Sequence, residues 1–402
     1  MKLLPSVFAF FFVAVTAAAQ SPAYTLHEWG TFTTVSGSDG VLLPGLQREE
    51  EALPDFVESH EGMRNLAALP GGSQEDLNIK GYIRPLKNVT VKMETPVIYF
   101  YTPQPFQAQV SVGFRGGSIS QWYPTRSGGE TPPPQNPTGL LDQAARLVTR
   151  NAVDGAIDFA TKYEGSIQWD VTVTPPTEAD SSVIFRGGET PNWIFPRQTD
   201  SALVTAKNGT ADKFLFYRGV GNFELPIVFT MPKDRLLTIQ NRGNAAIPRL
   251  FVFEKQQGGA GARFQLLDAL PSGKTTTIDL EKLTAVAEWH KPVYNTLAEA
   301  LRGAGLYRKE ADGMLQTWWQ SYFQKPGLRV FWIVPDSFTD AILPLRVTPA
   351  PKSTVRVLVG RAEILTPAFE KLLVEKQSGF QWLPFNDRYT DAYAERIRQL
   401  QH

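Results

Sequence analysis

The feature that most constrains this chain is a series of short segments between residues 79 and 123. Successive side chains of a strand point to opposite faces, so alternating apolar and polar residues are typical of a half-buried sheet. Short strands separated by short turns predict an antiparallel sheet, as in a sandwich or a jelly roll. The alternating or apolar-aromatic segments are residues 88–93, 96–101, 107–114 and 119–123.

Similar segments continue on both sides and predict a β-rich body over residues 20–280. The stretch 126–139 is rich in Pro, Gly and Ser, which predicts a linker or a long surface loop. A helix is expected to follow at residues 140–150. The further strand-like segments are residues 24–35, 166–173, 213–217, 226–229, 236–240, 250–254 and 263–267.

The pattern changes after residue 280 and predicts a smaller α+β portion over residues 281–402. Helical spacing predicts a helix at 296–302 and another at about 309–323, where apolar residues recur every three or four positions. Such a stripe is typical of a helix that packs on a core. Short strands are expected at 328–334 and 354–359, and a terminal helix at 387–400. The predicted fold is mainly β, with a C-terminal α+β portion.

The N-terminus has the pattern of a secretory signal peptide over residues 1–19. Met1 and Lys2 precede the apolar run 3–19, which ends in three alanines. A buried helix or a membrane anchor are the alternatives, but the run is short for an anchor and Pro5 would disturb a helix. We therefore expect cleavage near Ala19 and a secreted or periplasmic protein. No later stretch is apolar for long enough to anchor the mature chain in a membrane.

Composition excludes several classes of function. The chain has no cysteine, so disulfides, thiol nucleophiles and cysteine-ligated metals are excluded. Forty basic residues balance forty acidic residues, so no net charge attracts nucleic acid. The aromatic content is high, with 25 Phe, 12 Tyr and 9 Trp. In an exported β-protein most of these rings are core, and some exposed rings contact ligands.

The short motifs do not specify a cofactor or a metal. His27-Glu28 and His60-Glu61 each lack the second histidine, four residues after the first, that a helical zinc site needs. The segment 271–275 has the end of a phosphate-binding loop without its leading glycine, and the glycines near 219–221 do not complete a dinucleotide fingerprint. We predict no metal site, and the cofactor stays open.

Four segments resemble a family of exported bacterial proteins. They are HEWGTFT (27–33), KMETPVIYFY (92–101), FYRG (216–219) and VGRAE (359–363). The resemblance covers most of the mature chain and implies a periplasmic or extracellular location. It implies no activity.

The same segments place ionisable residues in strand-like surroundings, where a charge must face water or be paired. One interpretation is a set of solvent-facing positions and structural ion pairs. The other is that some of these residues line one cleft. The candidate catalytic residues are His27, Glu28, Asp39, Glu94 and Arg218. Neighbours on a strand point to opposite faces, so His27 and Glu28 would not share a simple site.

Three functions remain open. The first is an exported, envelope-associated or extracellular binding protein whose partner is a glycan or a cell-wall polymer, because flat aromatic rings stack on sugars. The second is a hydrolase in which Glu28, Glu94 or Asp39 supply acid or base groups, with His27 and Arg218 assisting. The third is a structural envelope protein without a small ligand. The candidate ligand-contacting residues, which lie in or beside expected turns, are Trp29, Trp122, Tyr123, Trp193 and Trp382.

Overall fold

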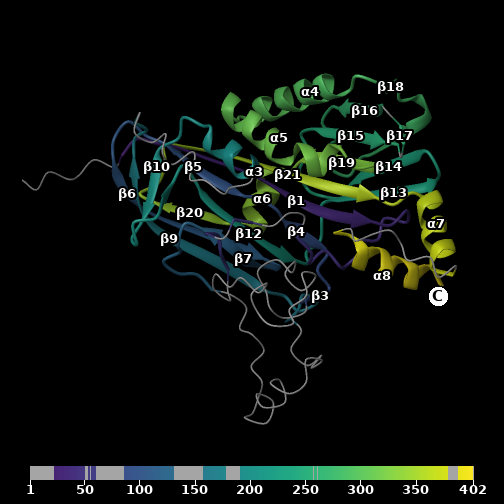
Figure 1. Cartoon of the computed structure of the whole chain (residues 1–402), viewed down its shortest axis with the longest axis horizontal. Coiled ribbons are helices and arrows are strands. Elements are labelled where there is room, and N and C mark those ends of the chain that lie inside the picture. Colours follow the sequence, from purple (N-terminus) through teal and green to yellow (C-terminus); the bar gives the residue numbers. More distant parts are fainter. Residues whose placement is uncertain are drawn as a thin grey trace, which may run out of the picture.

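The computed structural model describes residues 22–49, 53–54, 56–59, 86–130, 157–177, 191–256, 258–259, 261–378 and 388–401. Within these residues the chain is mostly strand, with helices concentrated in its C-terminal third (Figure 1). The prediction of a mainly β protein with C-terminal helices is confirmed. The signal-peptide region, the expected helix at 140–150 and the loop residues 131–139 lie outside the described residues.

The elements have the following bounds. The strands are β1 (Thr25–Ser36), β2 (Glu58–Ser59), β3 (Leu86–Lys87), β4 (Val91–Met93), β5 (Val97–Tyr101), β6 (Phe106–Arg115), β7 (Gly117–Tyr123), β8 (Ile157–Asp158), β9 (Glu164–Thr174), β10 (Leu203–Ala206), β11 (Ala211–Asp212), β12 (Leu215–Gly221), β13 (Ile227–Lys233), β14 (Leu236–Asn241), β15 (Leu250–Lys255), β16 (Ala262–Leu267), β17 (Thr275–Asp279), β18 (Ala285–Val286), β19 (Gly327–Ile333), β20 (Leu345–Thr348) and β21 (Ser353–Ile364). The helices are α3 (Pro191–Ile194), α4 (His290–Gly303), α5 (Arg308–Phe323), α6 (Asp336–Ile342), α7 (Pro367–Ser378) and α8 (Thr390–Gln401), with short 3-10 turns η5 (Phe195–Arg197) and η6 (Leu280–Lys282).

Most of the described strands form one large sheet around β1. Its main path runs β11-β10-β9-β7-β12-β4-β1-β21-β19-β15-β16-β18. Strand β1 pairs in parallel with β21 on one side and antiparallel with β4 and β5 on the other. The sheet is therefore mixed, and the finer prediction of an antiparallel sandwich or jelly roll is not established. Strands β19 and β21 from the expected C-terminal portion belong to this sheet, and the boundary at residue 280 stays a prediction.

Strand β1 is buried on both faces, so its alternation separates two cores. Leu26 and Phe32 point into a core that also contains the apolar face of the separate sheet β13-β14-β17. Trp29 points the other way, into a core covered by α4 and α5. In Figure 1 these two helices lie together over the part of the sheet that contains β15, β16 and β19. A third core lies under α7 and α8.

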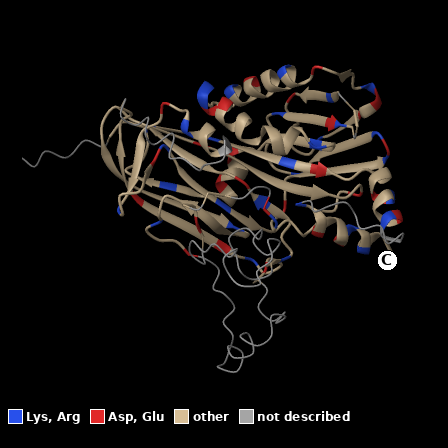
Figure 2. Cartoon of the chain, in the orientation of Figure 1, with Lys and Arg blue, Asp and Glu red and all other residues tan. Residues whose placement is uncertain are grey.

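Several predicted elements are confirmed with shifted ends. The helices expected at 296–302 and 309–323 are α4 and α5, and the terminal helix is α8. The strand expected at 88–93 is shortened to β4, and Asn88 before it adopts a left-handed backbone conformation with φ of 57°. Helices α6 and α7 were not predicted. Figure 2 shows acidic and basic residues interspersed on the outer helices.

Candidate functional site

His27 and Glu28 lie on opposite faces of β1, as alternation along a strand predicts. The His27 ring is buried under α5, and its Nδ1 atom lies 2.8 Å from an Oε2 oxygen of Glu310. The same carboxylate accepts a hydrogen bond from the Tyr101 hydroxyl at 2.8 Å. On the other face, Glu28 accepts hydrogen bonds from the Tyr217 hydroxyl and from Arg356. The two residues therefore belong to different buried clusters.

The other candidate catalytic residues are also paired. Glu94 lies 3.2 Å from the Lys92 ammonium group, and Arg218 forms an ion pair with Glu49. Asp39 is at the surface, where it accepts a hydrogen bond from Arg396 at 2.9 Å. The five candidates do not converge on one cleft. Among the residues that the structure describes, no group of three or more His, Asp or Glu could hold a metal ion.

Burial affects two of these guanidinium groups differently. It lowers the pKa of Arg218 to about 9, because the charged form is costly away from water. Burial also opposes the charge of Arg356, but the adjacent Glu28 carboxylate outweighs it and raises the pKa of Arg356 above its usual range. The pKa shift of Arg218 reflects burial and that of Arg356 reflects its ion pair with Glu28, and neither shift identifies a reactive group.

The candidate aromatic residues that the structure describes are buried, and the sequence predicted them in or beside turns. Trp29 and Tyr123 lie within strands, and Trp193 lies within α3 against Phe214 and Phe216. The Trp122 indole donates a hydrogen bond to Glu58. A ring that is packed inside the protein presents no face to a sugar. Trp382 lies outside the described residues.

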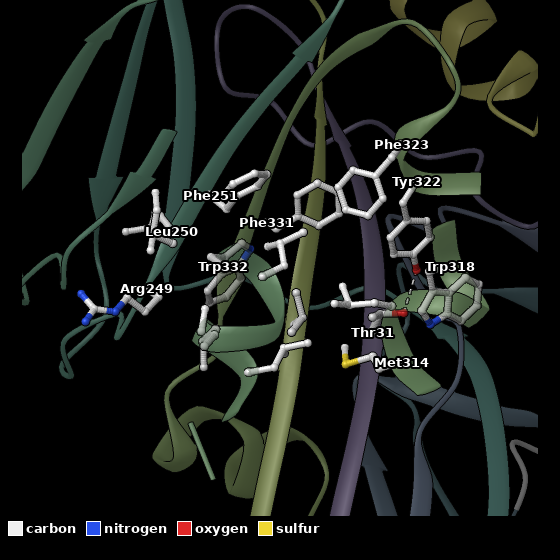
Figure 3. Close-up of a pocket in the computed structure, with 17 residues that line it drawn as sticks. Thr31, Arg249, Leu250, Phe251, Met314, Trp318, Tyr322, Phe323, Phe331 and Trp332 are labelled. Carbon is white, nitrogen blue, oxygen red and sulfur yellow. Dashed lines mark hydrogen bonds between the residues drawn. The ribbon is translucent and has the colours of Figure 1, made fainter. Parts of the chain in front are cut away.

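The structure instead forms a groove between the α4–α5 pair and the sheet (Figure 3). Its floor includes one row of residues that crosses four neighbouring strands. The row consists of Arg249, which directly precedes β15, Ile333 on β19, Val359 on β21 and Thr31 on β1. The Ile333 amide donates to the Arg249 carbonyl, which continues the register of β15 and β19. Three spacings between neighbouring strands make this row roughly 14 Å long.

The roof of the groove comes from the two helices and is almost entirely apolar. Helix α4 contributes Leu297, Ala300 and Leu301, and α5 contributes Met314, Leu315, Trp318, Tyr322 and Phe323. Phe331 and Phe251 complete the wall on the sheet side. The volume of the groove is about 50 Å³.

The two ends of the groove differ in chemistry. Figure 3 shows Arg249 at one end and Thr31, Tyr322 and Trp318 at the other. The Arg249 side chain is 44% exposed and lies 2.5 Å from Asp268, whose side chain is 98% exposed. At the inner end, the Thr31 and Tyr322 hydroxyls hydrogen-bond each other at 2.7 Å. The open end is charged, and the inner end is closed by neutral groups.

A second, more polar cleft lies between the residues that precede β13, the turn after β14 and the start of α6. Its volume is about 290 Å³. Leu225, Pro226, Pro335 and Phe338 supply apolar contacts, and Glu224, Arg242, Asn244 and Ser337 supply polar groups. The polar residues are exposed and suit hydrogen bonds to a hydroxylated ligand.

The sequence contained part of the signal for the groove. The spacing of apolar residues on α5 predicts a core-facing surface, and part of that surface lines the groove. Arg249 precedes a predicted strand in an ordinary loop, and no local pattern separates it from other surface arginines. Its role depends on strand pairing, which a single sequence does not give.

Comparison with known proteins adds no family. No protein-family model and no curated protein matches this chain. Among solved structures, a yeast delta-COP-I mu-homology domain complexed with a Dsl1 WxWxV peptide is 7% identical, with a TM-score of 0.27 over 87% of this chain and 98% of that chain. The Danio rerio Fcho1 mu homology domain with bound Eps15 peptide is 6% identical, with a TM-score of 0.29 over 87% and 100%. TM-scores this low support no inference about fold or function.

Proposed function

We propose that this is an exported binding protein that takes an apolar or amphipathic small molecule into the groove beneath α4 and α5. The observation that carries the proposal is the groove itself, an apolar channel with an arginine at its open end. Concave apolar sites with a few polar groups are the usual form of small-molecule sites in proteins. Each methylene group that leaves water contributes about 0.8 kcal/mol, so such a channel can bind a short chain.

A binding role fits the described residues better than hydrolysis. Glu28, Glu94 and Asp39 each lie beside a cation, and two of them are buried. A hydrolase of the carboxylate type needs two carboxyl groups that face the same substrate. The three candidates occupy separate places in the fold and do not provide that arrangement.

Export is part of the proposal and is supported by the sequence of residues 1–19. Because the chain has no cysteine, no disulfide stabilises the exported form. Among the described helices, none is long and apolar enough to cross a membrane.

The test is a thermal-shift series on residues 20–402 with decanol, decanoate and decane-based detergents at low concentration. Ligand at about 100 times its Kd should stabilise the fold by roughly 2.7 kcal/mol, which raises Tm by a few degrees. Ala300→Trp fills the groove from α4 and should remove the shift. Lys282→Ala, an exposed position away from the groove, is the control. A shift that persists in Ala300→Trp, or no shift in the parent protein, contradicts the proposal.

A glycan remains a second candidate because of the cleft beside α6. A half-buried Phe338 ring lies among Glu224, Asn244 and Ser337, and sugars bind through this combination of an apolar face and hydrogen-bonding groups. Oligosaccharides and peptidoglycan fragments belong in the same thermal series. A shift with one of them that is lost in Phe338→Ala and kept in Ala300→Trp assigns the glycan to this cleft. The absence of any such shift removes the candidate.

A further inference from the structure

We infer that the ligand of the groove is an unbranched apolar chain with a carboxylate at one end, bound with the carboxylate at Arg249 and the chain end beside Thr31 and Tyr322. This inference rests on the proposed function and adds the class and the orientation of the ligand. It follows from the row of residues that forms the floor of the groove, the chemistry of its open end and the chemistry of its inner end.

The dimensions select an unbranched chain. The row from Arg249 to Thr31 spans roughly 14 Å across four strands. The groove runs beneath one helix pair along a single row of strand residues, and this shape suits one extended chain better than a fused ring system or a sugar. The lining side chains are apolar along the whole middle of the row, where Ile333 and Val359 form the floor. A chain lying across the strands would contact these residues in order.

The open end selects a carboxylate. Among the described residues that line the groove, Arg249 is the cation, and its described side-chain partner is the exposed Asp268. An ion pair this exposed contributes little, so exchanging Asp268 for a ligand carboxylate costs little. A guanidinium group carries five N–H donors and can hold a carboxylate through two of them. Leu266, which is 38% exposed, lies at the same end and contacts the first carbons of a chain.

The inner end selects an uncharged terminus. Thr31 and Tyr322 satisfy each other by hydrogen bonding. The Trp318 indole N–H has no partner among the described residues, so it offers a neutral donor there. The Arg361 guanidinium lies 4.1 Å from the centre of the Tyr322 ring, but Arg361 does not line the groove. A carboxylate at this end would lose its hydration without contacting a cation, which is costly.

The experiment compares decanoate with decanol by isothermal titration on five proteins, the parent chain, Arg249→Ala, Arg249→Lys, Arg242→Ala and the groove-filling variant Ala300→Trp. Arg242 is an exposed arginine of the other cleft and serves as the matched control. Decanoate should bind the parent protein more tightly than decanol does. Arg249→Ala should weaken decanoate binding about tenfold and change decanol binding less than about twofold. Arg249→Lys should retain part of the preference, and Arg242→Ala should behave as the parent protein.

Three other results would contradict the carboxylate, the orientation or the binding site. Equal affinities for decanoate and decanol, both lost in Ala300→Trp, would contradict the carboxylate and leave the groove as the binding site. A decanoate preference that persists in Arg249→Ala would place the carboxylate elsewhere and contradict the orientation. No binding of either compound to the parent protein would contradict both the inference and the proposed function. Arg249 is half exposed, so a folding defect is not expected, and the Tm of each variant checks this.

Discussion

At the scale of single residues, the ionisable side chains in or beside the central strands are buried in contact with partners. The sequence indicated which residues these are, because His27, Glu28, Glu94 and Arg218 stand in strand-like surroundings. It did not indicate their partners, since Glu310 is 283 positions away from His27 and Arg356 is 328 positions away from Glu28. Pairing across such distances is set by the tertiary structure. The interpretation of structural ion pairs therefore applies to Glu28 and Glu94.

Arg356 offers a matched test of burial, because it contacts two carboxylates in different surroundings. The Glu28 side chain is 5% exposed and the Asp340 side chain is 66% exposed. We expect Glu28→Ala to lower the free energy of unfolding by about 3–5 kcal/mol, because it leaves a buried cation without its main partner. Asp340→Ala should cost less than about 1 kcal/mol. Urea unfolding measures both, and equal losses would contradict the assignment.

At the scale of elements, the local sequence pattern predicted where helices and strands lie better than it predicted which strands pair. The spacing of apolar residues located α4, α5 and α8, and alternation located β1 and β6. The parallel pairing of β1 with β21 was missed because alternation gives the faces of a strand and says nothing of the direction of its partner. Helix α6 was missed because it has seven residues, too few for a clear period. The floor of the groove includes Thr31 and Val359, which are brought together by the pairing of β1 with β21. Because that pairing was not predicted, the floor could not be predicted either.

Glu363 joins several elements and predicts how acid affects them. It accepts a hydrogen bond from Arg329 at 2.7 Å, pairs with Arg361 on its own strand and lies 3.5 Å from the Tyr389 hydroxyl. Burial by itself would raise the pKa of Glu363, but Arg329, Arg361 and Arg388 together hold it below its ordinary value of 4.5. A carboxyl group with a lowered pKa stabilises the fold fully above its unfolded-state pKa. That stability is lost as the pH falls through the lower, folded-state value.

We therefore expect the free energy of unfolding of the parent protein to fall as the pH drops below about 4.5. Glu363→Gln should be less stable at neutral pH and should show a shallower dependence in that acid range. Glu299→Gln, an exposed position on α4, should keep the parental slope. Urea unfolding at a series of pH values checks the three proteins. A parental slope in Glu363→Gln would show that the ion pairs of Glu363 do not stabilise the fold.

At the scale of the whole molecule, a two-sided central sheet explains both the stability and the proposed site. Without disulfides, the protein depends on large cores, and β1 separates the core under β13-β14-β17 from the core under α4 and α5. The groove lies within the second core, where the helix pair and four neighbouring strands leave a narrow channel. The high aromatic content indicated a large core from the sequence. The position of the channel depends on how the helices cover the sheet.

The most direct test of the groove is a crystal structure of residues 20–402 grown with decanoate. We predict electron density for decanoate between α4, α5 and the row from Arg249 to Thr31, with the decanoate carboxylate at Arg249. An empty groove at a saturating decanoate concentration, or decanoate bound at another surface, would contradict the central claim.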